Sequence, residues 1–291
     1  MPAKRRKPTP TKRTKPAPRG RRKFDPANPH WIPGIHYYCD RWCERCEFSH
    51  RCLRFALAER IHGSGGARKM AGARTVFDAL DRMFQETRHE LDEAARSGIR
   101  SGDERRVAAH VAVEKRLHRR ALSAGARETK AALTYARIVD EWFNNELKLP
   151  LEHVRSLEER VHKGLIRVSD AKGDLVRLNE SVEIIRWHQH LPYVKLCRAL
   201  ISRVEEDTAR EGSRNRDSDG SAKVALVSIE ESIAAWTQVS EMFTEKTDSV
   251  LEILVHLTRL RRAIEQRFPK ARKFKRPGFD EKPRRKRKAP G

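Results

Sequence analysis

The chain has no long apolar run. No stretch of its 291 residues approaches the length needed to cross a bilayer. It begins with MPAKRRKPTP, a charged, proline-rich run that lacks the apolar segment of a secretory signal. Alternation of apolar and polar residues, which would indicate strands, is essentially missing as well. We therefore expect a cytoplasmic, all-α protein that does not associate with a membrane.

Sequence motifs of common enzymes are also missing. We find no Gly-rich nucleotide loop, no nucleophile motif and no internal repeat of the solenoid kind. We therefore expect a binding or structural protein rather than an enzyme. The alternative hypotheses are an iron–sulfur redox or nuclease-related enzyme, and a helical adaptor for a protein partner.

Acidic residues are scarce at the two ends of the chain, where most of the net charge of +23 is found. Residues 1–23 hold eleven Lys and Arg and no acid, and residues 269–291 hold eleven with two acids. The remaining residues, 24–268, have 41 basic and 38 acidic side chains. We expect two disordered basic arms that associate weakly and non-specifically with nucleic acid, on a nearly neutral body.

Between these arms the sequence predicts two parts. Residues 24–52 are interrupted by three prolines and should form an irregular Cys-rich segment. Residues 53–268 have apolar residues three or four apart, which predicts a bundle of about seven helices. A polar break, REGSRNRDSDGSA, precedes a helix from Lys223, with Asp219 or Ser221 as its N-cap. Examples of the apolar stripes are Phe77, Leu80, Phe84 and Leu91; Tyr135, Val139 and Trp142; Val154, Leu157, Val161 and Leu165; and Ile253, Leu257, Leu260 and Ile264.

Four of the five cysteines fall within one short stretch, YYCDRWCERCEFSHRC. Their spacing is C-x3-C-x2-C-x5-C, and the short loops would let all four soft sulfur ligands converge on one metal centre. Such tightly nested thiols favour an iron–sulfur cluster, with zinc as the alternative. The predicted ligands are Cys39, Cys43, Cys46 and Cys52. The fifth cysteine, Cys197, lies far downstream.

Residues near the cysteines suit such a centre. Three arginines would offset the negative charge of the thiolates, and two aromatic side chains could shield a cluster from water. Two histidines are possible substitute ligands, but with four sulfurs available we interpret them as surface or supporting residues. These residues are Arg41, Arg45 and Arg51; Trp42 and Phe48; and His36 and His50.

The motif CERCEFSHRC resembles the C-x2-C-x5-C iron–sulfur motif in RecB-like nucleases of the CRISPR-associated and AddB types. The resemblance implies that Cys43, Cys46 and Cys52 are cluster ligands. In those enzymes the fourth cysteine lies far upstream, whereas Cys39 is adjacent here, and we find no Asp followed by Glu-x-Lys that would hold magnesium. Nuclease activity is therefore not implied.

The first three cysteines alone have the C-x3-C-x2-C spacing of radical SAM enzymes, which leave one iron open for the cofactor. Cys52 could close that position, and the chain lacks the repeated strand–helix units of their barrel. A broader resemblance is to uncharacterised bacterial helical proteins, on GIHYYCDRWCERCEFSHRC, EIIRWHQHLPYVKLCRAL and GSAKVALVSIEESIAAW. It implies a shared helical fold and cysteine site.

Two other patterns lose weight when placed on a helix. The pairs Glu86/His89 and Glu159/His162 are spaced like ligands of a di-iron bundle, but both point away from the predicted core stripes. His188 and His190 lie two residues apart, about 200° around a helix, so joint metal binding would require local unwinding. We expect core or surface roles for both of these histidines.

Overall fold

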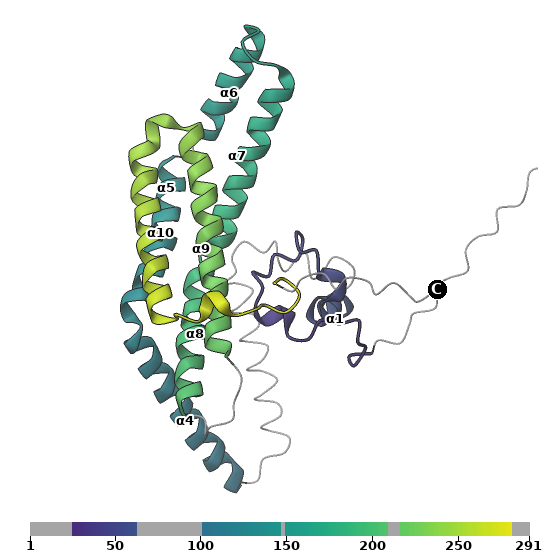
Figure 1. The fold of residues 1–291 in the computed structure, drawn as a ribbon, viewed down its shortest axis with the longest axis vertical. Coiled ribbons are helices and arrows are strands. Elements are labelled where there is room, and N and C mark those ends of the chain that lie inside the picture. Colours follow the sequence, from purple (N-terminus) through teal and green to yellow (C-terminus); the bar gives the residue numbers. More distant parts are fainter. Residues whose placement is uncertain (1–24, 63–100, 147–148, 209–215, 281–291) are drawn as a thin grey trace, which may run out of the picture.

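The computed structural model describes residues 25–62, 101–146, 149–208 and 216–280. Within these ranges all regular structure is helical and no strand occurs, so the predicted all-α fold is confirmed. Seven long helices, α4 to α10, form the bundle (Figure 1). Their bounds are Ser101–Ala124 (α4), Ala126–Asn145 (α5), Leu149–His162 (α6), Val168–His188 (α7), Leu191–Thr208 (α8), Asp217–Met242 (α9) and Thr247–Arg267 (α10).

Helix α9 lies at the centre of the bundle and packs against α7, α8 and α10. Its residues are buried on nearly every side over its first half, which is rich in Ser, Ala and Gly. Such small residues let neighbouring helices approach closely. Further along, the fully buried Trp236 donates a hydrogen bond from Nε1 to the hydroxyl of Tyr135 on α5, at 3.2 Å. This contact satisfies a polar group that would be costly to bury alone.

A glycine lies at the break between α4 and α5. A Cβ atom at Gly125 would lie only 2.2 Å from Cδ1 of Leu200 on α8. Its φ of −107° is open to other residues, so glycine is needed here for the close approach of α8 and not for the turn itself. The long α4 and α5 meet here at the outer edge of the bundle.

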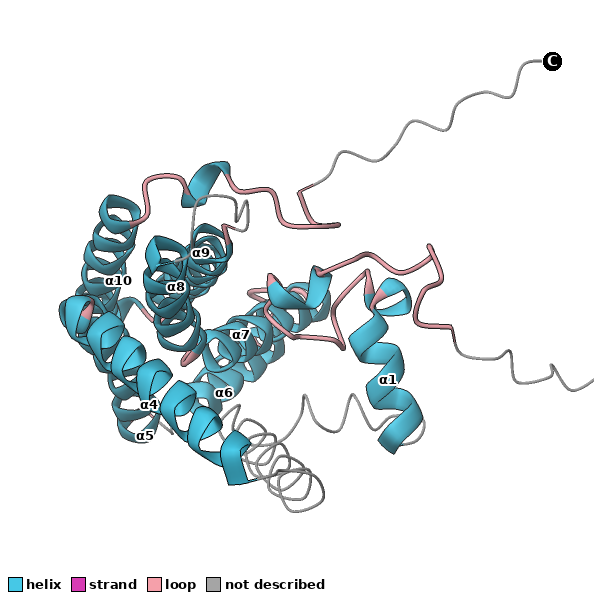
Figure 2. Cartoon of the chain, turned by 90° about the horizontal axis from the view of Figure 1, so that it is seen from below, coloured by secondary structure: helices cyan, strands magenta, loops and turns pink. Residues whose placement is uncertain are grey.

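The cysteine segment packs beside the bundle, and two of its turns are the short 3₁₀ helices η1 (Ile35–Tyr37) and η2 (Ser49–Arg51). The sequence placed the start of the bundle at Leu53, but helix α1 (Leu53–His62) packs against η2 and stands apart from the bundle helices (Figure 2). Its apolar residues are spread around the helix and Leu57 is 38% exposed, so α1 has no stripe to bury in the core.

The predicted disordered tail from residue 269 is wrong for its first twelve residues. Residues 271–280, here called the C-terminal strap, include the 3₁₀ helix η4 (Ala271–Lys273) and cross the bundle to the cysteine segment (Figure 1). Ala271 is fully buried. Asp280 accepts hydrogen bonds from the Arg276 guanidinium and forms an ion pair with Lys223 at 2.7 Å. Burial would raise the pKa of Asp280, but these partners lower it.

Helix α9 begins six residues earlier than predicted, so neither Asp219 nor Ser221 is its N-cap. Instead, Glu206 of α8 accepts hydrogen bonds from the backbone N–H of Ser218 at 2.9 Å and from its hydroxyl at 2.6 Å. A carboxylate from a neighbouring helix thus satisfies an N–H group that a local side chain would otherwise cap. This tertiary contact is not visible in the sequence pattern.

Several predictions lie outside the described residues: the stripe Phe77 to Leu91, the pair Glu86/His89, residues 1–23 and residues 281–291. Among the helices that the structure does describe, none combines the length and the apolar character required to span a membrane.

Candidate metal centre

The cysteines lie on a segment built from tight turns. Side-chain oxygens of Asp25 and Asn28 accept backbone N–H bonds two residues ahead, at 2.9 and 2.8 Å, and so fold the chain locally. Gly34, with φ 72°, and Arg41, with φ 63°, take left-handed conformations that reverse its direction. The prolines exclude a continuous helix, as the sequence predicted.

All four thiols of the segment are partly buried. Burial, together with the neighbouring charges of Cys39, Cys52 and Cys46, raises the pKa of Cys43 to about 12. Burial also raises the pKa of Cys39 and of Cys46. The Sγ atom of Cys39 lies 3.6 Å from the carbonyl oxygen of His36. Cys43 therefore interacts electrostatically with the other three cysteines.

In this conformation the four thiols do not form a set of metal ligands. Among the described residues, no three His, Cys, Asp or Glu side chains surround a common point in metal-binding geometry. The histidines interpreted as surface or supporting residues, His36 and His50, lie within the segment, and the carbonyl oxygen of His50 lies 3.0 Å from Nε2 of His30. The four-cysteine metal site thus stays a prediction from sequence that requires a local rearrangement of the turns.

Trp42 anchors the segment to α7. Its ring stacks on Trp187 with centroids 4.9 Å apart and an interplanar angle of 16°, and Trp187 Nε1 donates to the carbonyl oxygen of Asp40 at 3.2 Å. The guanidinium of Arg45 lies 4.1 Å from the Trp42 ring centroid and pairs with Glu183 of α7. Of the aromatic and basic residues that we predicted to serve the thiols, Trp42 and Arg45 thus contact the bundle.

Tyr38 is the second anchor and is fixed by three elements. Its ring lies against Gly220 of α9 and against Phe274 of the strap, with ring centroids 4.7 Å apart in the latter pair. Its hydroxyl hydrogen-bonds Asp217, which also accepts two bonds from the Arg198 guanidinium at 2.8 and 3.0 Å. Burial and this carboxylate raise the pKa of Tyr38. Tyr38 thus joins the segment to the start of α9.

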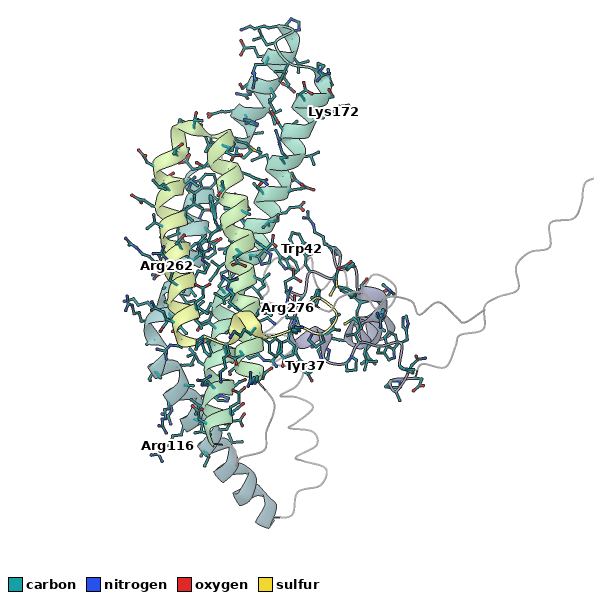
Figure 3. The ribbon with its side chains drawn as sticks, in the orientation of Figure 1. Tyr37, Trp42, Arg116, Lys172, Arg262 and Arg276 are labelled. Carbon is teal, nitrogen blue, oxygen red and sulfur yellow. The ribbon has the colours of Figure 1, made fainter. Side chains whose placement is uncertain are left out.

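Phe48 makes the third anchor, because its ring meets Phe279 of the strap edge-on at 5.2 Å. Gly278 of the strap, with φ 81°, brings its backbone against Ile32 and Ile35. Figure 3 shows Tyr37, Trp42 and Arg276 together where the segment, the strap and the bundle meet. Residues 39–52 of the segment, here called the cysteine loop, are thus held between the bundle and the strap.

A buried cation lies beside the thiols. Lys195 of α8 is only 5% exposed and donates one hydrogen bond, at 3.0 Å, to the carbonyl oxygen of Tyr37. Burial lowers its pKa to about 8, while the neighbouring charge of Cys39 and, more weakly, that of Asp217 act to raise it. Burial lowers the pKa of the half-buried Arg41, while the neighbouring charges of Cys39 and Cys43 act to raise it. Within the described ranges, neither cation forms an ion pair with a carboxylate.

The histidines of the two other sequence patterns differ in their exposure. Glu159 and His162 are exposed on α6, as expected from their helical positions. His188 is buried at the end of α7, and its Nδ1 lies 3.0 Å from Oγ of Ser228. His190 lies beyond that helix end and lines a separate pocket with Tyr193. Of the core or surface role expected for this pair, His188 takes the core one.

The burial of His188 leads to a pH-dependent stability. Burial lowers its pKa to about 4, although the charge of Asp40 opposes this effect. Because the unfolded chain takes up a proton near the ordinary value of 6.5, the free energy of unfolding should fall as pH drops from 6.5 to about 4. The loss should reach about 3 kcal/mol. Urea unfolding of wild type and His188→Gln across this range should give a difference between them that changes by this amount; a constant difference would contradict the assignment.

Comparison with known proteins gives no relative for this chain: no family model, no curated protein and no solved structure matches it.

Proposed function

We propose that this chain is a non-catalytic helical protein that binds an iron–sulfur cluster or a zinc ion through Cys39, Cys43, Cys46 and Cys52. In this proposal the bundle and the strap hold the cysteine loop, and the basic arms add a weak association with nucleic acid. When bound, the metal would cross-link the turns of the loop and stabilise its packing on the bundle.

The observation that carries the proposal is the buried, unpaired charge of Lys195. An ammonium group removed from water costs several kcal/mol when it is not offset by an anion. Zinc or an iron–sulfur cluster held by four thiolates leaves a net negative charge on the centre. Lys195, with Arg41, lies where it would offset that charge. The cation therefore fits the metal-bound loop better than a loop of neutral thiols.

Metal analysis tests the proposal directly. Protein purified without oxygen should carry zinc, or iron together with acid-labile sulfide, in proportion to the chain. Cys43→Ser should lose most of this metal because Cys43 interacts with all three other thiols. Cys197→Ser, which removes the cysteine outside the segment, should retain it. Wild-type protein without metal would refute the proposal.

The arms are tested separately. A chain lacking residues 1–23 loses eleven basic side chains and should bind single-stranded DNA more weakly at low salt. The dependence of log affinity on log salt should also become shallower, because fewer counterions are released. Affinity and salt dependence equal to those of the full chain would show that this arm makes no contact with nucleic acid.

A further inference from the structure

Far from the cysteine loop, arginines converge around a cleft between the start of α5 and the end of α10. The cleft has a volume of about 590 Å³. Its lining includes one carboxylate and four guanidinium groups: Glu128, Arg127, Arg259, Arg262 and Arg267. Over residues 24–268 the numbers of basic and acidic side chains nearly balance, at 41 and 38, so composition alone does not indicate a basic face. The fold nevertheless brings four arginines and only one carboxylate together at this cleft.

One of the four arginines is already neutralised. Arg267 donates from Nε to Oε1 of Glu128 at 2.8 Å, and from Nη2 to the carbonyl oxygen of Ala124 at 2.8 Å. Glu128 itself is 8% exposed, so this ion pair forms the floor of the cleft. Because Glu128 pairs with Arg267, it does not neutralise the charge of the other three arginines.

The other three arginines, Arg127, Arg259 and Arg262, are exposed, and none forms an ion pair within the described residues. Arg259 and Arg262 are three residues apart on α10, so their side chains share one face and repel each other. By contrast, Arg186 pairs with Asp140, and Arg272 pairs with Glu230 and Glu265. An anion in the cleft would relieve this repulsion.

The positive charge continues along α4. Arg116, Arg119 and Arg120 are exposed and, being three or four residues apart, lie on one side of that helix. Figure 3 shows Arg116 and Arg262 on the same edge of the bundle, directed away from Tyr37 and Trp42. The basic surface is therefore extended, and it is separate from the cysteine loop.

We infer that the cleft of Arg127, Arg259 and Arg262 binds phosphate groups, and that together with α4 it forms a path for the backbone of a single-stranded nucleic acid. A guanidinium group is planar and presents paired donors that match two phosphate oxygens. A free phosphorylated small molecule shares this chemistry, but the extension along α4 favours a polyanion. The inference goes beyond the proposed function, since it depends neither on the metal nor on the arms.

The test uses the full chain and a fluorescent oligothymidine as the probe. In Arg259→Gln/Arg262→Gln, two phosphate contacts are lost, so the slope of log affinity against log salt should fall by about 1.4. At low salt the affinity should drop on the order of tenfold. The matched control is Arg155→Gln/Arg160→Gln, which removes the same charge from exposed positions on α6. The arms are identical in both variants.

The control should change affinity and slope much less than the cleft variant does. Equal losses in both variants would overturn the inference, because they would reflect net charge alone. If oligothymidine binding is unchanged but the cleft variant no longer binds inorganic phosphate, the ligand is a free phosphate compound and the nucleic-acid path is refuted. Metal content should stay at the wild-type level in both variants, so failure here is distinguishable from failure of the metal proposal.

Discussion

Gly220→Ala should destabilise the protein by about 1–3 kcal/mol, although alanine is the better helix former. A Cβ atom at position 220 would lie 2.3 Å from Cε1 of Tyr38 and 2.7 Å from Cζ of Phe274. Both rings belong to packed elements, so neither can move without loosening the cysteine segment or the strap. The clash outweighs a gain in helix propensity of at most about 1 kcal/mol.

Gly173→Ala is the matched control. Gly173 also lies within a helix, α7, but nothing lies within 4 Å of a Cβ at that position. It should stabilise the protein by a few tenths to about 1 kcal/mol. Urea unfolding followed by tryptophan fluorescence measures both variants, since Trp42 and Trp187 stack where the segment meets α7. Stabilisation by Gly220→Ala equal to that of the control would contradict the docking described above.

Lys195→Met should have opposite consequences for the metal-free and metal-bound protein. Without metal, the change removes a buried, unpaired charge and leaves only the carbonyl of Tyr37 without its donor. The free energy of unfolding should then stay constant or rise by about 1–3 kcal/mol. With metal, the same change removes a cation beside the thiolates, and metal affinity should fall about 10–100-fold.

Chelator competition measures the affinity, and unfolding of the chelated protein measures the stability. Lys172→Met is the control, because Lys172 is an exposed lysine on α7, far from Trp42 and Tyr37 in Figure 3, and should alter neither quantity. Wild-type metal affinity in Lys195→Met would show that the buried ammonium does not serve the cysteine loop. The proposal would then lose the observation that carries it.

Much of the helical fold is predictable because apolar spacing of three and four residues reports on local structure. Leu257 and Ile264 of α10 and Tyr135 of α5 are buried where their stripes placed them. The prediction fails at the end of α6. Leu165 continues the apolar stripe of this helix in the sequence, but its side chain is 68% exposed. The reason is that the helix ends at His162 and the chain turns at Gly164, which has a φ of 68°.

The partners of the cysteine loop could not be predicted. Tyr38, Lys195, Gly220 and Phe274 are far apart in the sequence, and only the topology of the bundle brings them together. Some signals were present: an isolated glycine within a helical stretch often marks close packing, and Phe274 and Phe279 are unusual in a disordered tail. The high charge of residues 269–291 obscured these two aromatic side chains.

The strap also has a consequence for how the protein is made. Synthesis starts at the N-terminus, so the four cysteines leave the ribosome long before Lys195, Gly220 and Phe274, which later cover their segment. Until these residues have been made, the segment lacks the contacts that hold it on the bundle, and its thiols are more exposed than in the finished fold, where they are partly buried. In the metal-binding proposal, the thiols are therefore easiest for a metal ion to reach during translation.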